Sequence, residues 1–547
     1  MDEPKWGNTV PSSKEALRWQ AWRVGAGDGK KFDSLSEHQG LLYWETQNPG
    51  PSMELQKQAP QPRFNAQIDR STHERHVGDQ LGVSGENMVC HISKLPTETL
   101  TSVFFACTEN ERARWQVARH AHMHKNSPPL VFLSVCKRWR QIAKSSSALW
   151  STLKVEADNL KDARMMSRWL QFADEQPLTI TLFVGWNRRI ADLAIDVLLE
   201  RQAYWVQVDL HWCLPDCAPL LAHSFTPNNA PLLQRFSITT DLHERGKLEN
   251  IVDAGLGKLL TGSTDLRTFE WSLQFTTAPE SPIDLSGIPF SNLRHLKLGC
   301  CMAFPRCLDI LNRTPLLESC DLIYVEYSDD PSMHATIQLP KLRSLCVKTD
   351  CPMDDFLDAL TLPSLQRIEV AFRIYDTGAL DSEDAEAGMF PDWPHTAFLA
   401  LLQRSACPLA ELSLGTPVSA DELLQYLPLV SPTLRTLSLR GTFGWACVDH
   451  RVLAQLTVLP HSSAAVLCPR LRALRLDACF VPALPQNAVA DLVHSRLVHA
   501  AAAGDGVPME VDLTADTGAV HDDDWRRLEV LCMRSAGKAR VAVTQLG

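Results

Sequence analysis

The sequence predicts an α/β protein in which a short helical module precedes a solenoid of parallel strands. Two apolar helical stripes lie close together within residues 89–156. From about residue 231 to residue 547, a six-residue leucine pattern recurs. Residues 1–88 are rich in Gln, Ser, Gly, Pro and charge and poor in aliphatic side chains, so we expect a disordered tail there.

Composition narrows the function classes. The chain has 547 residues and a formal net charge of −11. An acidic chain without a long basic run is a poor candidate for binding nucleic acid, because phosphate neutralisation needs clustered Lys and Arg. The first residues lack the basic and then apolar stretch of a signal peptide, and no apolar run is long enough to span a membrane. We therefore expect neither a membrane nor a nucleic acid as partner.

Cysteine usage points to a reducing compartment. The 16 cysteines are scattered, and no two of them form a CxxC pair. In a chain without an export signal, such cysteines are most simply reduced thiols that serve as small apolar side chains. We expect a cytoplasmic or nuclear protein.

The first helix of the module is predicted at residues 95–107. Leu100, Val103, Phe104 and Cys107 fall at positions i, i+3, i+4 and i+7, on one face of a helix. Pro96 suits the first turn, because the N–H that proline lacks would have no partner there.

The second helix is predicted at residues 130–144. Its apolar stripe consists of Phe132, Val135, Cys136, Trp139, Ile142 and Ala143. Lys137, Arg138 and Arg140 occupy the opposite face. A short turn with Leu149 and Trp150 follows.

A polar stretch with His120, His122 and His124 separates the two predicted helices. In an extended segment, three alternating imidazoles project to one side and could bind zinc. No Cys or carboxylate cluster nearby completes such a site, so a solvated loop is the favoured interpretation and no metal is expected.

The repeat pattern is L-x-x-L-x-L. Its copies lie at 232–238, 266–271, 293–298, 317–322, 342–347, 365–370, 409–414, 434–439 and 471–476, with a last copy expected at 528–533. Several successive copies are 23 to 25 residues apart, which is the period of a leucine-rich repeat, where each repeat supplies one strand and a return segment. We therefore expect an irregular leucine-rich-repeat solenoid, a horseshoe with parallel strands.

The remaining segments are assigned by exclusion. Residues 157–230 are expected to be a linker with irregular first repeats, including strands at 177–184 and 205–212. The gaps at 374–396, 443–467 and 481–524 are expected to be long loops.

The helical module resembles the F-box family. The residues that carry the resemblance are Leu95, Pro96, Glu98, Val135, Cys136, Lys137, Trp139, Leu149 and Trp150. Thr99 departs from the family pattern, in which an aliphatic residue is usual at that position. The order of tail, F-box and irregular leucine-rich repeats is similar to that of F-box proteins of mushroom-forming fungi.

The resemblance implies a non-catalytic receptor. An F-box docks on a Skp-type adaptor, which sits on a cullin scaffold of an SCF-type ubiquitin ligase, and the receptor raises the local concentration of its substrate. The residues expected at the adaptor surface are Leu95, Pro96, Val103, Val135, Cys136, Trp139, Leu149 and Trp150. Neither catalytic residues nor a cofactor are expected.

The target protein, whose identity stays open, is expected to bind the face of the repeat strands that the leucines leave free. The candidates are His295, Lys297, Arg367, Glu369, Arg440 and Arg475. For any single one of them, a solvated sheet face is the competing interpretation. The alternative for the whole chain is a leucine-rich-repeat scaffold or interaction protein without a role in ubiquitin transfer, and an enzyme is a remote third class.

Overall fold

The computed structural model describes one unit of the chain, which lies within Cys90–Gly547. The described residues are 91–117, 126–185, 187–212, 229–240, 260–273, 288–299, 302–326, 336–349, 351–372, 392–441, 446–459, 466–482, 484–502, 508–516, 518–534 and 539–546. The tail expected at 1–88 lies outside them.

A helical module begins the unit. It consists of η1 (His91–Lys94), α2 (Thr97–Val117), α3 (Phe132–Val135), α4 (Lys137–Ser145) and η2 (Ser147–Trp150). The first helix is longer than predicted, because it continues through part of the polar stretch after Cys107. The second predicted helix is divided into α3 and α4 at Cys136, whose backbone is extended (φ −156°, ψ 172°).

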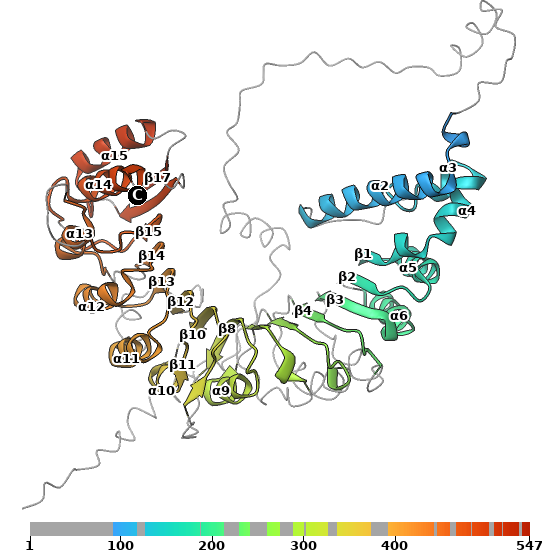
Figure 1. The fold of residues 1–547 in the computed structure, drawn as a ribbon, viewed down its shortest axis with the longest axis horizontal. Coiled ribbons are helices and arrows are strands. Elements are labelled where there is room, and N and C mark those ends of the chain that lie inside the picture. Colours follow the sequence, from blue (N-terminus) through green and yellow to red (C-terminus); the bar gives the residue numbers. More distant parts are fainter. Residues whose placement is uncertain are drawn as a thin grey trace, which may run out of the picture. The chain divides into compact units, whose positions relative to one another are not determined.

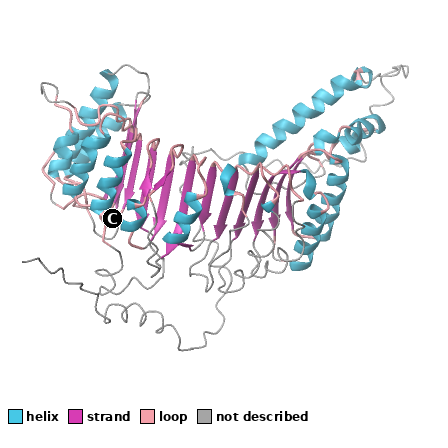
Figure 2. Ribbon diagram, turned by 60° about the horizontal axis from the view of Figure 1, so that its bottom comes forward, coloured by secondary structure: helices cyan, strands magenta, loops and turns pink. Residues whose placement is uncertain are grey.

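One large parallel sheet runs through the rest of the unit (Figure 2). Its strands are β1 (Thr152–Ala157), β2 (Leu178–Val184), β3 (Trp205–Trp212), β4 (Arg235–Thr240), β5 (Thr268–Leu273), β6 (His295–Gly299), β7 (Met302–Ala303), β8 (Ser319–Glu326), β10 (Ser344–Thr349), β12 (Arg367–Phe372), β13 (Glu411–Gly415), β14 (Thr436–Arg440), β15 (Ala473–Asp477), β16 (Met509–Asp516) and β17 (Ala539–Leu546). All except β7 follow one another in chain order across the sheet, and β7 pairs with β8. A second sheet consists of β9 (Ile337–Gln338) and β11 (Leu360–Thr361).

The return segments contain helices that lie on one face of this sheet (Figure 1). They are α5 (Leu160–Ala173), α6 (Arg188–Leu199), η3 (Gln202–Tyr204), η4 (Phe290–Asn292), α9 (Phe304–Asn312), α10 (Asp354–Asp358), α11 (His395–Ser405), α12 (Ala420–Val430), α13 (His450–Leu456), α14 (Ala488–Ala502) and α15 (Asp522–Arg534). Parallel strands require such crossovers, because the chain must return to the same end of the sheet before the next strand begins.

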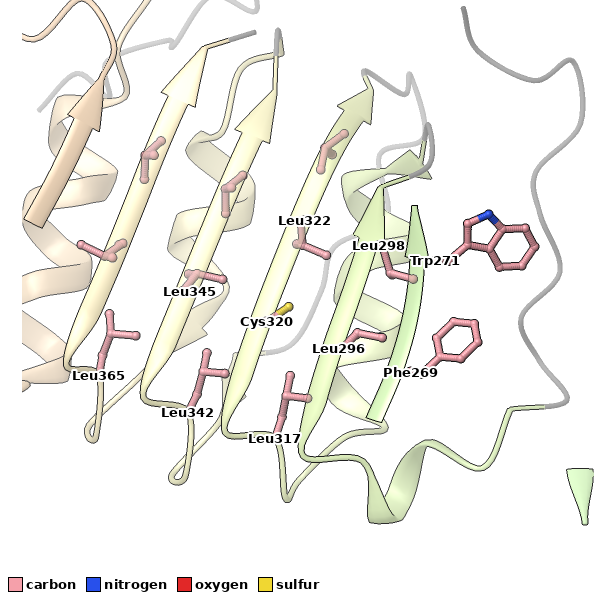
Figure 3. Close-up of a cluster of buried hydrophobic side chains, with 14 of the residues drawn as sticks. Phe269, Trp271, Leu296, Leu298, Leu317, Cys320, Leu322, Leu342, Leu345 and Leu365 are labelled. Atoms are coloured by element: carbon pink, nitrogen blue, oxygen red, sulfur yellow. The ribbon is translucent and has the colours of Figure 1, made fainter. Parts of the chain in front are cut away.

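The core lies between the sheet and these helices (Figure 3). The parallel register sets Leu296 of β6 beside Cys320 of β8, and Cys320 beside Leu345 of β10. All three side chains are at most 2% exposed. Because side chains alternate along a strand, the neighbouring residues point to the opposite face. Each such leucine contributes roughly 1.5–3 kcal/mol by burial, so stacking repeats stabilises the whole sheet.

The predicted repeats from 232–238 to 471–476 are confirmed, since each contributes one strand of the large sheet. The strands predicted at 177–184 and 205–212 are confirmed as β2 and β3, and they belong to the same sheet. The fold class is therefore α/β with a parallel, solenoid-like repeat.

The last predicted repeat, at 528–533, is wrong, because these residues lie inside helix α15. Leu528 is buried at a helical spacing from Asp524, which is also buried. The strands on either side of α15 are β16, with the sequence MEVDLTAD, and β17, with the sequence ARVAVTQL. Met509, Val511, Leu513 and Ala515 are the buried residues of the first of these strands, and Val541 and Val543 are half-buried in the second, so a pattern that requires leucine at three positions misses both.

Two of the three expected loops also contain regular structure. The segment 443–467 contains α13, and 481–524 contains α14 and the whole of β16. The third, 374–396, ends at the start of α11, and most of it lies outside the described residues.

Candidate partner-binding surfaces

The helical module has an aromatic core of its own. The rings of Phe104 and Phe132 stack with centroids 4.1 Å apart, and Trp139 packs edge-on against Phe104 at 4.9 Å. Leu100 and Ile142 are buried beside them. The module therefore has a core of its own and needs no partner to bury Phe104 and Phe132.

The break at Cys136 has a chemical cause. The Cys136 Sγ accepts a hydrogen bond of 3.4 Å from the backbone N–H of Trp139, so the thiol caps the N-terminus of α4. Arg138 donates to the backbone carbonyl of Leu95 at 2.5 Å and ties α4 to the start of α2. The break turns Val135 and Cys136 outward, and both side chains are exposed.

Three more of the predicted adaptor contacts are at least partly accessible, namely Val103, Pro96 and Leu95. Val103 is 43% exposed, compared with 53% for Val135, while Pro96 is exposed and Leu95 is half-buried. Exposed valines on a module that buries Leu100, Phe104 and Phe132 are the kind of surface that a partner covers.

Leu149 and Trp150 must be removed from the predicted adaptor surface. Both are 0% exposed, and the Trp150 Nε1 donates a hydrogen bond of 2.8 Å to the carbonyl of Ala143. They join the module to the first repeat instead. Trp139 is half-buried in the aromatic core, so truncating it would disturb the module as well as any contact that it makes.

The second candidate surface is the open face of the sheet, defined as the face opposite the helices. The register aligns its side chains in rows across the strands. The row through Lys297 continues through Asp321, Cys346 and Glu369. All six predicted target-binding residues project from this face: His295, Lys297, Arg367, Glu369, Arg440 and Arg475.

The centre of the open face carries a cluster of ion pairs within and between neighbouring strands. Glu369 lies 3.2 Å from Lys348 and 3.1 Å from Arg367, and Arg367 reaches Glu411 at 3.6 Å. Burial alone would raise the pKa of Glu369, but Lys348 and Arg367 hold it below its ordinary value. These side chains are therefore organised before any partner arrives.

Asp321 and Cys346 lie within this cluster. Burial raises the pKa of the Asp321 carboxyl, against the opposing attraction of Lys297. Burial, followed by the charge of Glu369, raises the pKa of Cys346 to about 12. The thiol is therefore neutral at physiological pH and unsuited to nucleophilic chemistry.

The other two predicted arginines form ion pairs farther along the sheet. Arg440 lies 3.0 Å from Asp477, and Arg475 lies 3.1 Å from Glu510. At least half of each arginine side chain is exposed, so each pair contributes little to stability and can exchange partners.

Sequence reasoning missed an aromatic pair near the first strands. The rings of Phe183 and His211 stack at 4.3 Å on the open face, with the Lys154 ammonium 5.7 Å from the Phe183 centroid. The signal was available, because both residues occupy open-face positions of the two strands predicted at 177–184 and 205–212.

Within the described residues, no group of three His, Cys, Asp or Glu side chains is arranged to hold a metal ion. His120, His122 and His124 lie outside those residues. No described helix combines the length and apolar character that a membrane crossing requires.

Comparisons with known proteins add little. Neither the protein-family models nor the curated proteins include a match. Among solved structures, the chain is similar to the crystal structure of a Bacteroides fragilis protein from the Northeast Structural Genomics Consortium, at 11% identity. The match covers 71% of this chain and 72% of that one with a TM-score of 0.23.

Proposed function

We propose that this chain is the substrate-recognition subunit of an SCF-type ubiquitin ligase. In this proposal, the helical module binds a Skp-type adaptor, and the open face of the sheet binds the target protein. The observation that supports it best is the exposure of Val103 and Val135 on a module that buries Phe104 and Phe132 in a core of its own. The same module carries the Leu-Pro, Val-Cys-Lys and Leu-Trp elements that resemble an F-box.

The chain itself would perform no chemistry. It would hold a target near the charged conjugating enzyme and thereby raise the effective concentration of the target's lysines. The ion-pair cluster at Arg367 and Glu369 offers a target both charge signs on a preorganised surface.

A single charged substitution on the exposed surface of the helical module tests the adaptor contact. Full-length chain is purified together with a Skp-type adaptor, and co-elution is compared between wild type and Val135→Asp. An uncompensated carboxylate in an apolar interface costs several kcal/mol, so we expect co-elution to be lost. Val498→Asp is the matched control, because Val498 is 56% exposed but lies in α14 of the repeats.

Two results would count against the proposal. The adaptor role is lost if the wild type does not co-elute with the adaptor. The assigned surface is wrong if Val135→Asp and Val498→Asp bind equally well. Circular dichroism of both variants checks that the exposed substitutions leave the fold intact.

The alternative is a repeat scaffold without a ligase role. The open face, with its ordered ion pairs, is equally suited to a permanent binding partner. Reconstituted ubiquitin transfer to a captured target, with and without this chain, separates the two. Transfer that does not depend on the chain favours the scaffold.

A further inference from the structure

The strands in the middle of the large sheet begin along one continuous hydrogen-bonded row. The residue before each strand donates from its backbone N–H to the carbonyl of the corresponding residue one strand earlier, at 2.7 or 2.8 Å. Neighbouring members of this entry row are therefore about 4.8 Å apart, which is the spacing of strands in a sheet. From β5 to β15 the members are Arg267, Arg294, Glu318, Arg343, Gln366, Ala410, Arg435 and Arg472.

The part of the row from β10 to β15 is strongly basic. We define the entry edge as the row members of these strands together with the residue two positions before each, which gives Lys341, Arg343, Ser364, Gln366, Pro408, Ala410, Thr433, Arg435, Arg470 and Arg472. These positions hold five cations and no carboxylate, on a chain whose formal net charge is −11. All five cations are exposed except Arg472, which is half-buried.

The cations of the entry edge differ from those of the open face in their partners. On the open face, Arg367, Arg440 and Arg475 each lie 3.0 or 3.1 Å from a carboxylate oxygen. Among the side chains that the structure describes, no carboxylate forms an ion pair with Lys341, Arg343, Arg435 or Arg470. Because like charges in one row repel each other, a ligand that brings carboxylates would relieve this repulsion. The entry edge is therefore complementary to an acidic ligand.

The charges of the entry edge form two groups. Lys341 and Arg343 lie at the start of β10, whereas Arg435, Arg470 and Arg472 lie at the starts of β14 and β15. Four strand spacings, or about 19 Å, separate β10 from β15, and the stretch between the two groups is neutral. An extended peptide of about six residues spans the same distance.

We propose that the entry edge binds an acidic segment of a partner protein, which lies extended across the strands with carboxylates near both of its ends. A nucleic acid fits less well, because its phosphates are continuous. Some of them would face the neutral stretch, and others would face Glu318 and Glu411, which lie on β8 and β13 beside the entry edge. The inference does not depend on the proposed ligase role, because a receptor and a scaffold could both use this surface.

The test follows the fluorescence anisotropy of labelled hexaglutamate during titration with the full chain. The wild type should bind this peptide, with an affinity that falls as salt concentration rises, and should bind labelled hexaserine at least about tenfold more weakly. Arg343→Glu/Arg435→Glu should raise the dissociation constant for hexaglutamate at least about tenfold, because each reversal removes an attraction and adds a repulsion. Arg343→Gln/Arg435→Gln, which adds no repulsion, should raise it by a smaller factor.

Lys161→Glu/Arg164→Glu is the matched control, because it makes the same change in net charge on exposed residues of α5, beside the first strands of the sheet. It should bind hexaglutamate like the wild type. A wild type that binds hexaserine as tightly as hexaglutamate overturns the inference. Tighter binding of a labelled oligothymidylate of six nucleotides overturns the class of partner. Equal affinities of the two charge-reversed variants overturn the assigned surface.

Discussion

The indole Nε1 of Trp169 donates a hydrogen bond of 2.8 Å to the backbone carbonyl of Trp150, and the two rings pack edge to face at 5.1 Å. Trp150 ends the helical module, and Trp169 lies in α5, the first helix of the repeats. Both side chains are buried. The module and the first repeat therefore share one core and should unfold together.

Trp169→Phe tests this junction. Phenylalanine keeps most of the ring contact but leaves the Trp150 carbonyl without its donor, which should lower the free energy of unfolding by about 1–3 kcal/mol. Urea denaturation followed by far-UV and near-UV circular dichroism measures the change. Lys161→Ala, an exposed substitution on the same helix, should have little effect. Separate transitions for module and repeats would show that the junction does not couple them.

A buried arginine organises the later repeats. Arg496 is 1% exposed, and its guanidinium donates to the carbonyls of Leu456, Leu467 and Cys468 at 2.6, 2.7 and 2.8 Å. Burial lowers the pKa of Arg496 to about 10, so the group is still charged at neutral pH. It therefore holds the end of α13 and the start of the next strand segment by charge-assisted hydrogen bonds.

Arg496→Met should destabilise the chain by about 3 kcal/mol, because methionine fills much of the space but leaves three carbonyls without donors. Chemical denaturation measures it. The exposed Arg470 provides the control, and Arg470→Met should stay within about 0.5 kcal/mol of the wild type. Equal stability of the two variants would mean that water replaces the guanidinium without cost.

The open face should respond to pH through Glu369. Its folded-state pKa is lowered, so its contribution to stability is present above the ordinary glutamate pKa and is lost as pH falls through the folded pKa. Glu369→Gln should therefore be less stable than wild type at neutral pH, with the difference vanishing in acid. Urea denaturation across this pH range measures it, and a difference that persists in acid would contradict the assignment.

Asp321 should behave in the opposite way. Its folded-state pKa is raised by burial, so stability is greatest below the ordinary aspartate pKa and falls as pH rises through the folded pKa. Asp321→Asn should be more stable than wild type at neutral pH and equal to it in acid. A less stable variant at neutral pH would show that the attraction of Lys297 outweighs burial.

The sequence predicts the repeats well where leucines mark them. Leu345 and Leu412 occupy positions whose spacing alone indicates buried strand residues, and both are 0% exposed. The strand that contains Val511 escaped prediction, because only one of its four buried residues is a leucine and a long helix precedes it. This strand is recognised only because it pairs with the preceding strand of the sheet, and such pairing depends on residues far apart in the sequence.

The candidate surfaces were predicted less completely. Motif identity selected Val135 and Trp150 alike, but periodicity does not reveal that Trp150 points into a core shared with Trp169. Alternation placed Arg367 and Glu369 on the open face, whereas their pairing with Lys348 depends on the register of neighbouring strands. The spacing of the leucines gives that register, because Leu345 pairs with Ile368 at the same offset as Leu342 and Leu365, but it does not give the side-chain conformations that bring the charges together.

Hydrogen–deuterium exchange of the full chain, with and without a Skp-type adaptor, tests the proposed role of the helical module. With the adaptor present, we expect slower exchange in α2 and around the α3–α4 break at Cys136. Exchange in β6 to β16 should remain unchanged. Unchanged exchange throughout the module, or protection confined to the repeat strands, would show that the module is not the adaptor-binding surface.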